Sequence, residues 1–152
     1  MLGELALRSK AWWGYDDDFI ASCRDELLRS PGPMSSFDQV SFVAFSEVAN
    51  EQELVLGFHS IARLSSRAFD LAALFVEPDW IGNGVGRRLI EHAKRTAEVL
   101  GADRLRIESD PHSVDFYRAA GAVVIGEAPS ASLSGRSLPL LEIDLTQLRF
   151  AA

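Results

Sequence analysis

Three glycines at alternate positions, Gly82, Gly84 and Gly86, form the pattern in this sequence that is best suited to chemistry. They follow an apolar, strand-like segment and open a long amphipathic helical pattern. Glycines in such a turn let successive backbone N–H groups point into one concavity at a helix N-terminus, and that concavity suits a phosphate group. The turn is not a dinucleotide-binding Gly-x-Gly-x-x-Gly, because Arg87 takes the last glycine position, and no P-loop Gly-Lys-Ser/Thr follows. The structural alternative is a glycine-rich connection that binds no ligand.

The spacing of the apolar residues predicts the elements that position this turn. Leu2, Leu5 and Ala6 predict a short first helix that Lys10 and the bulky segment 12–15 interrupt. A second helix is expected after the acidic residues 16–18. Alternation with period two then predicts an antiparallel meander with strands over residues 38–48, 54–64 and 68–76. The remaining elements are expected as a helix over 89–100, a strand over 104–108, a helix over 113–120, and strands over 122–127 and 138–145.

The composition predicts one domain over residues 1–152. Of these 152 residues, 47% are hydrophobic and 24% are charged, so one sizeable core is expected. Fifteen Lys and Arg against 22 Asp and Glu give a formal net charge of −7, which disfavours nucleic acid as a partner. The apolar runs are too short to cross a bilayer and the first residues do not resemble a signal peptide, so no membrane partner is expected. Cys23 is the single cysteine, as in proteins of a reducing compartment, and predicts a cytoplasmic location.

Two segments carry a resemblance to a known family. Residues 74–89 read LFVEPDWIGNGVGRRL and residues 110–122 read DPHSVDFYRAAGA. The first resembles the acetyl-CoA signature Gln/Arg-x-x-Gly-x-Gly/Ala of the GCN5-related N-acetyltransferase (GNAT) family, and the second resembles that family's Asn-x-x-Ala-x-x-Phe-Tyr-x-x-x-Gly-Phe. The order of strands and helices from residue 38 to 145 also matches. The resemblance implies an α/β (α+β) fold with a mixed, largely antiparallel central sheet of about six to seven strands flanked by about four helices.

The resemblance further implies that acetyl-CoA is the co-substrate. Its pyrophosphate is expected at the glycine turn and its pantetheine arm along the open edge of the preceding strand, where a backbone N–H could stabilise the oxyanion of the tetrahedral intermediate. No metal is expected, since His59, His92 and His112 have no metal-ligand spacing with Cys23 or with one another. The implied cofactor-binding residues are Leu74, Phe75, Val76, Gly82, Asn83, Gly84, Val85, Gly86, Arg87, Arg88, Asp110 and Tyr117.

Three departures from the family pattern affect these expectations. Ile81 stands where the family has Gln or Arg, so one polar side chain near the pyrophosphate is missing while the glycine backbone remains. Asp110 replaces Asn, which exchanges an amide that donates and accepts for a carboxylate that only accepts when ionised, and alters the expected pantetheine contact. The family also begins with a strand before the first helix, whereas this sequence begins almost inside that helix.

Two residues are expected to carry the proton transfers. In similar enzymes the tyrosine at the position of Tyr117 protonates the departing CoA thiolate, and the alternative is a core tyrosine whose hydroxyl reaches water. Its neighbour Phe116 is expected in the core. The acceptor amine must lose a proton to a carboxylate or to an ordered water, and Glu108 is the candidate carboxylate, with a solvated strand residue as its alternative.

The aromatic residues after the first helix are candidates for the acceptor side. In this fold the first two helices line that side of the cleft, so Trp13 and Tyr15, beside the acidic residues 16–18, are expected to hold a cationic amine. Capping of the core is the alternative for both. Arg136 is a second candidate at this entrance.

The function expected from the resemblance is direct transfer of acetyl from acetyl-CoA to a primary amine of a small molecule or peptide. No acyl-enzyme is expected, because Cys23 has no base beside it in sequence. A non-catalytic acetyl-CoA-binding regulatory module is the alternative, and a purely structural or interaction domain is a third. Similar proteins are often dimers, so a homodimer is one expected arrangement.

Overall fold

The computed structural model describes residues 2–15, 17–18, 20–21, 39–47, 53–130 and 135–150. Within them the α-helices are α1 (Leu2–Trp12), α3 (Val85–Val99) and α4 (Val114–Ala119). The strands are β1 (Gln39–Glu47), β2 (Glu53–Arg63), β3 (Ala68–Val76), β4 (Arg104–Glu108), β5 (Val123–Pro129) and β6 (Ser137–Asp144). Short 3₁₀ turns are η1 (Pro78–Trp80), η2 (Pro111–Ser113) and η3 (Thr146–Phe150).

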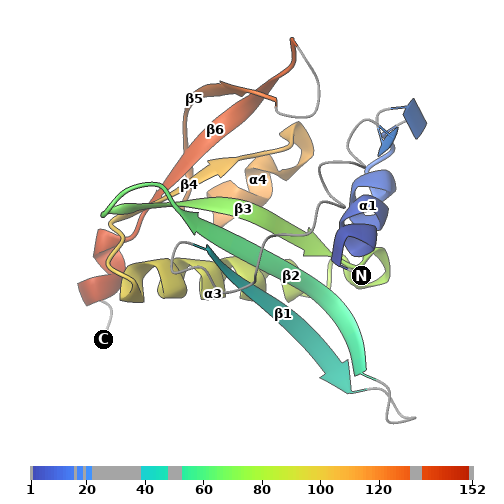
Figure 1. Ribbon diagram of the computed structural model, residues 1–152, viewed down its shortest axis with the longest axis horizontal. Coiled ribbons are helices and arrows are strands. Elements are labelled where there is room, and N and C mark those ends of the chain that lie inside the picture. Colours follow the sequence, from blue (N-terminus) through green and yellow to red (C-terminus); the bar gives the residue numbers. More distant parts are fainter. Residues whose placement is uncertain are drawn as a thin grey trace.

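The six described strands form one sheet in the order β1-β2-β3-β4-β6-β5 (Figure 1). Each neighbouring pair is antiparallel except β3 and β4, which run parallel. A parallel pair needs a crossover connection, and α3 supplies it. The sheet is therefore mixed and largely antiparallel, as expected.

The parallel pair of strands separates soon after it forms. β3 and β4 pair over only three positions, from Ala68 opposite Arg104 to Asp70 opposite Arg106, although β3 continues to Val76. β2 remains paired with β3 as far as Val76. From Leu71 onward, one edge of β3 therefore has no strand hydrogen-bonded to it among the described elements. The divergence of β3 from β4 is visible in Figure 1.

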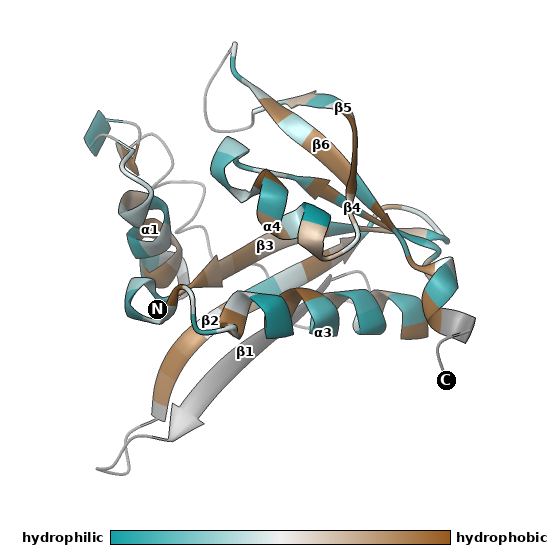
Figure 2. Ribbon diagram, turned by 180° about the vertical axis from the view of Figure 1, so that it is seen from behind, coloured by the Kyte–Doolittle hydropathy of each residue, from teal (hydrophilic) through white to brown (hydrophobic). Residues whose placement is uncertain are grey.

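The helix α3 covers one face of the sheet. Its buried residues follow helical spacing and are Val85, Leu89, Ile90, Ala93 and Ala97. Ile90, Ala93 and Ala97 join the largest core cluster with residues of β2, β3, β4 and β6, including the fully buried Phe69 and Leu105. Figure 2 shows β3 as largely hydrophobic and α3 as mixed along its length. The position of α3 is thus set by one apolar stripe, which also fixes its N-terminus beside the end of β3.

The helix α1 packs against the opposite face of β3. Leu5 and Ala6 are buried against Phe58 and Phe75, whereas Leu74, the neighbour of Phe75, packs on the α3 side. Successive side chains of a strand point to opposite faces, which explains this division. Arg8 Nε and Nη2 donate hydrogen bonds to the two carboxylate oxygens of Glu77, at 3.0 and 2.8 Å. These bonds connect α1 to the residue that follows β3.

The strands were predicted more closely than the first helix. The predicted ranges 68–76 and 104–108 coincide with β3 and β4, and the other strands are displaced by one or two residues. The prediction that Lys10 interrupts the first helix is wrong: α1 continues to Trp12, and Gly14, with φ +85°, adopts the left-handed conformation typical of a helix end. Leu100 was placed on the buried face of α3, but it follows the last helical residue and is 39% exposed.

The described residues contain three complete α-helices, and residues 17–18 and 20–21, within the expected second helix, are also helical. Most of the expected second helix, including Cys23, lies outside the described residues. No helix in the described part of the chain has the length and apolar character that crossing a membrane requires.

Candidate active site

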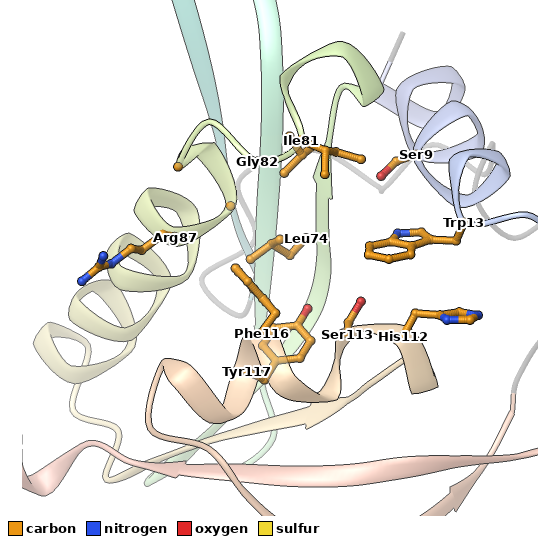
Figure 3. Close-up of a pocket in the computed structure, with 13 residues that line it drawn as sticks. Ser9, Trp13, Leu74, Ile81, Gly82, Arg87, His112, Ser113, Phe116 and Tyr117 are labelled. Atoms are coloured by element: carbon orange, nitrogen blue, oxygen red, sulfur yellow. The ribbon is translucent and has the colours of Figure 1, made fainter.

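A cavity of about 340 Å³ lies where β3 separates from β4. Figure 3 shows Leu74, Phe116 and Tyr117 between α3 on one side and α1 on the other. The lining residues come from α1, β3, the glycine turn, the start of α3, η2 and α4: Ser9, Trp13, Leu74, Val76, Ile81, Gly82, Gly84, Gly86, Arg87, His112, Ser113, Phe116 and Tyr117. Segments far apart in the sequence therefore meet at one site.

The glycine turn forms the upper wall of the cavity in Figure 3. Gly82 and Gly84 have φ angles of +88° and +84°, a conformation that side chains with a Cβ rarely adopt, and the space in front of both is open. Gly84 is the N-cap of α3, and its carbonyl accepts the first hydrogen bond of the helix from the N–H of Arg88, at 3.1 Å. The N–H groups of the preceding turn have no intrahelical acceptor, so this end of α3 suits an anion.

Gly86 serves a different purpose from the other two glycines. Its φ is not positive, but a Cβ there would lie 3.2 Å from the Phe116 ring and 3.5 Å from Val76. The third glycine therefore allows α3 to approach α4 closely. The prediction that Phe116 is a core residue is incomplete, because its ring packs against the core and also lines the cavity.

The open edge of β3 presents backbone groups to the cavity. The N–H of Glu77 donates to the carbonyl of Leu56 on β2, at 2.7 Å. Backbone polar groups alternate in direction along a strand, so those of Phe75 also face β2, whereas those of Leu74 and Val76 face the open edge. Leu74 and Val76 line the cavity, but the Phe75 side chain lies on the opposite face, 5.7 Å from the Phe58 ring.

The polar residues of the glycine segment are divided between the cavity and solvent. Arg87 lines the cavity and extends away from Trp13 in Figure 3. Asn83 and Arg88 are exposed and do not line it. Val85 is buried against Leu56 and Leu89, so its side chain supports the turn from below. Of these four predicted cofactor residues, only Arg87 has its side chain at the cavity.

Tyr117 packs its ring in the core and faces the cavity with its hydroxyl, so its catalytic role stays a prediction. Its ring is 8% exposed and belongs to the largest core cluster, while its hydroxyl points toward Leu74 in Figure 3. Burial, followed by the negative charge of Asp110, raises the pKa of this phenol well above its usual value. The hydroxyl therefore keeps its proton at neutral pH and can act as a hydrogen-bond or proton donor within the cavity.

Glu108, the candidate base, is not brought to the cavity. Its carboxylate accepts a hydrogen bond from Arg106 at 2.9 Å, and both side chains are about one-third exposed. The neighbouring Asp70 on β3 is more buried, and one of its carboxylate oxygens has no hydrogen-bond partner among the described residues. Burial and the nearby Glu108 raise the pKa of Asp70, while Arg106 lowers it. Asp70 does not line the cavity either.

Asp110 lies at the centre of a group of polar side chains beside the cavity. Lys10 Nζ lies 3.6 Å and Arg136 Nη2 3.9 Å from Asp110 Oδ1, and the Tyr15 hydroxyl donates to the same oxygen at 3.4 Å. Arg136 also donates to the Tyr15 hydroxyl at 3.3 Å. We call Lys10, Tyr15, Asp110 and Arg136 the Asp110 cluster. Asp110 itself does not line the cavity, so its predicted contact with the cofactor has no counterpart in the lining residues.

The two predicted acceptor-binding aromatics have different environments. Trp13 lines the cavity and stacks on His112, with ring centroids 5.6 Å apart and an interplanar angle of 8°. Tyr15 does not line the cavity, and its ring already has Lys10 Nζ at 5.9 Å and Arg136 Cζ at 5.5 Å. Two cations of the protein beside one ring disfavour a third, so Tyr15 is better suited to holding Arg136 than a cationic acceptor.

Five lining residues were not predicted to form the site. They are Ser9, Ile81, His112, Ser113 and Phe116. Helical spacing from Leu5 and Ala6 could have placed Ser9 beside them on the buried face of α1, where it is 6% exposed. His112 and Ser113 stand inside the second signature, but at positions that the signature leaves variable or fills with Ala. Their role depends on the meeting of η2 with α1, which no sequence pattern indicated.

Within the described residues, no group of three or more His, Cys, Asp or Glu side chains is arranged to hold a metal ion. His59 and His92 do form a pair, with Nε2 and Nδ1 3.0 Å apart, between β2 and α3. Burial, followed by the charge of His92, lowers the pKa of His59 to about 4. Neither histidine lines the cavity, and the pair supports the packing of α3 on the sheet.

Comparison with known proteins defines the family. A family model described as an acetyltransferase (GNAT) domain matches residues 41–131. The chain belongs to the GNAT acetyltransferase family. It is 37% identical over 94 residues to the peptidyl-lysine N-acetyltransferase YjaB of Escherichia coli K12, an alignment that covers 62% of this chain and 58% of that protein. The Salmonella typhimurium LT2 protein of the same name is 37% identical over 71 residues, 47% of each chain.

Solved structures share the fold at low sequence identity. The PaiA N-acetyltransferase of Thermoplasma acidophilum, crystallised with coenzyme A, superposes with a TM-score of 0.69 at 19% identity over 94% of this chain and 90% of that one. An aminoglycoside 6'-N-acetyltransferase, also complexed with coenzyme A, gives a TM-score of 0.66 at 17% identity over 95% and 88%. The predicted GNAT-like fold is thereby confirmed.

Proposed function

We propose that this chain, acting as a single domain over residues 1–152, transfers the acetyl group of acetyl-CoA directly to a primary amine. The observation that carries the proposal is the cavity at the separation of β3 and β4, with the open amides of α3 at one end and the Tyr117 hydroxyl within it. A thioester with a long polar arm and a pyrophosphate fits this arrangement. It needs an anion site, a row of backbone hydrogen-bonding groups and a proton donor.

The cofactor would be held chiefly by backbone groups. The Gly82–Gly86 turn and the first amides of α3 would bind the pyrophosphate, with Arg87 adding positive charge. Leu74 and Val76 would offer N–H and C=O groups to the pantetheine arm, as an added strand would receive them. A backbone N–H at this edge would also stabilise the oxyanion that forms at the thioester carbonyl. The loss of the family's polar side chain at Ile81 leaves these backbone donors intact.

Tyr117 would complete the transfer. When the amine attacks the carbonyl and the C–S bond breaks, the CoA thiolate needs a proton. Because burial raises its pKa, the Tyr117 hydroxyl holds that proton until the thiolate forms. The reaction then needs no covalent acyl-enzyme, and the acceptor and acetyl-CoA must be bound together.

A lysine side chain of a protein is the acceptor we favour. The support is the 37% identity over 94 residues to YjaB, whose name states peptidyl-lysine acetylation. A lysine needs only a narrow approach to the thioester, which the cavity beside Trp13 provides. Small-molecule amines remain the competing acceptors.

The proposal is tested in two stages with the intact protein. Acetyl-CoA at about one hundred times its dissociation constant should stabilise the fold by about 2.7 kcal/mol, seen as a higher melting temperature than with a matched salt control. CoA release is then measured with an N-terminally blocked peptide containing one lysine, against the same peptide with acetyl-lysine. Stabilisation by acetyl-CoA without CoA release in the presence of any amine would favour the non-catalytic regulatory module. No stabilisation would contradict both the acetyltransferase and the regulatory module.

A further inference from the structure

The proposed reaction requires a group that takes a proton from the acceptor. An alkylammonium cannot attack a thioester, so the amine must lose one proton before the C–N bond forms. Among the thirteen residues that line the cavity, three side chains are titratable: Arg87, His112 and Tyr117. Arginine remains protonated in proteins, and Tyr117 holds its proton because burial raises its pKa. Histidine is the side chain type that accepts a proton near neutral pH.

We propose that His112 is the catalytic base that deprotonates the acceptor amine. This inference rests on the proposed acetyl transfer. His112 lies on the α1 side of the cavity beneath Trp13, and its exposed imidazole extends away from the Tyr117 hydroxyl, whereas Arg87 lies on the α3 side (Figure 3). The proposed base thus lies at the exposed α1 side of the cavity, and the acid Tyr117 lies within it.

The His112 imidazole contacts two aromatic rings. Its imidazole stacks on the Trp13 indole at 5.6 Å with an interplanar angle of 8°, and it meets the edge of Tyr15 at 5.5 Å. An aromatic face stabilises an adjacent cation. Tyr15 also belongs to the Asp110 cluster, in which Asp110 faces Lys10 and Arg136 and so has its charge largely offset. Asp115 follows on α4 and is exposed.

The carboxylates near the cavity are less suited to this step. Glu108 is ion-paired with Arg106, Asp110 is held by two cations and a hydroxyl, and Asp70 lies on the strand outside the lining. A carboxylate with a cationic partner is a weaker proton acceptor than one without. His112 combines a position in the lining with a basic nitrogen.

The proton balance closes with the two residues. His112 takes one proton from the ammonium, giving the free amine and an imidazolium. The amine nitrogen then attacks the thioester carbonyl, the C–S bond breaks, and Tyr117 gives its proton to the thiolate. The new amide nitrogen loses its second proton to the Tyr117 phenolate through water, and His112 releases the first to solvent. The products are an acetylated amine, CoA thiol and one proton.

The test uses His112→Phe, which keeps a ring against Trp13 but has no basic nitrogen, with His112→Gln as a second variant. Turnover of the blocked lysine peptide is measured from pH 6 to 10, and slow release of CoA to water is followed in the same preparations. The expected result is about a 10²-fold loss at neutral pH that shrinks toward pH 10, where the peptide amine is increasingly free without a base. Acetyl-CoA stabilisation of the fold should be unchanged.

A constant ratio of variant to parent rates across the pH range, or full activity in His112→Phe, would overturn the role of His112 as a base. Since water attack on the thioester also needs a base, the same comparison on CoA release to water decides the role when the peptide is not a substrate. If the parent protein binds acetyl-CoA but does not acetylate the peptide, the lysine acceptor is wrong. The role of His112 is then decided by the rate of CoA release to water in the parent and in the variants.

Discussion

The two ends of the cavity are built in different ways. The end proposed to bind the cofactor, here called the cofactor end, is made of backbone: the left-handed glycines Gly82 and Gly84, the first amides of α3, and the open edge of β3. The end proposed to bind the acceptor, here called the acceptor end, is made of side chains, chiefly the stacked pair Trp13 and His112. A backbone site depends on residues that lie next to one another in the chain. A side-chain site depends on how distant segments pack, so the acceptor end can change without disturbing the cofactor end.

The free energy of unfolding should fall in acid because of His59, which lies where α3 packs on β2. His59 lies buried between β2 and α3 with a pKa lowered from 6.5 to about 4. As pH falls below 6.5 the unfolded chain binds a proton that the folded chain does not, so stability is lost between 6.5 and 4. The loss reaches about 3 kcal/mol. Urea unfolding at pH 7 and pH 4.5 should show it, and the difference should shrink in His59→Gln.

The reaction and the cofactor affinity should separate at Tyr117. Tyr117→Phe keeps the ring in the core but removes the proton that the thiolate would take. Turnover should fall by about 10²-fold, because general acid catalysis acts in the transition state, while acetyl-CoA affinity should hardly change. Steady-state kinetics with the lysine peptide and a thermal titration with acetyl-CoA measure the two effects. Unchanged turnover would return Tyr117 to a packing role.

The backbone nature of the cofactor end is tested at Gly84. Its φ of +84° is strained for any residue with a Cβ, and Gly84→Val should weaken acetyl-CoA binding by about 1–3 kcal/mol, or roughly 5- to 150-fold. Arg118→Ala, on the exposed surface of α4, is a matched control for an unrelated change and should bind normally. A folded Gly84→Val with the parent affinity would show that the turn does not hold the cofactor.

The same contrast explains how much could be predicted from the sequence. Strand ranges 68–76 and 104–108 were predicted because period-two alternation and bounding turns are local properties. The turn at Gly82 and Gly84 was predicted for the same reason, because glycine is the residue type that readily adopts a positive φ. The extent of α1 was not, because its end depends on Gly14 rather than on the polarity of Lys10.

Residues of the acceptor end could be predicted only in part. Trp13 was expected there, but its partner His112 lies about one hundred positions away along the chain and meets it only through tertiary packing. Asp110 was assigned to the cofactor because of its place in the second signature. The partners that hold it, Lys10 and Arg136, come from two other segments. Sequence spacing contains no information on such a meeting.

Replacing Asp110 tests whether it belongs to the acceptor end. Asp110→Asn restores the family's amide but removes the charge that faces Lys10 and Arg136. These partly exposed ion pairs contribute about 0–1 kcal/mol each, so the acceptor KM should rise by roughly two- to fivefold. Acetyl-CoA affinity should stay constant, as judged by thermal titration. A change in cofactor affinity with a constant acceptor KM would instead assign Asp110 to the pantetheine arm.

The smallest effect is expected at Glu108, the carboxylate first considered as the base. Glu108→Gln removes the charge but keeps a side chain able to accept a hydrogen bond from Arg106. Because the ion pair is about one-third exposed and does not line the cavity, the free energy of unfolding should change by less than about 1 kcal/mol. Turnover of the lysine peptide should stay within about twofold of the parent at every pH, because Glu108 is not the proposed base. Loss of a general base would lower turnover by about 10²-fold or more. A large loss at neutral pH that recovers at high pH would place the base at Glu108 on the β4 side and leave His112 with the stacking of Trp13 alone.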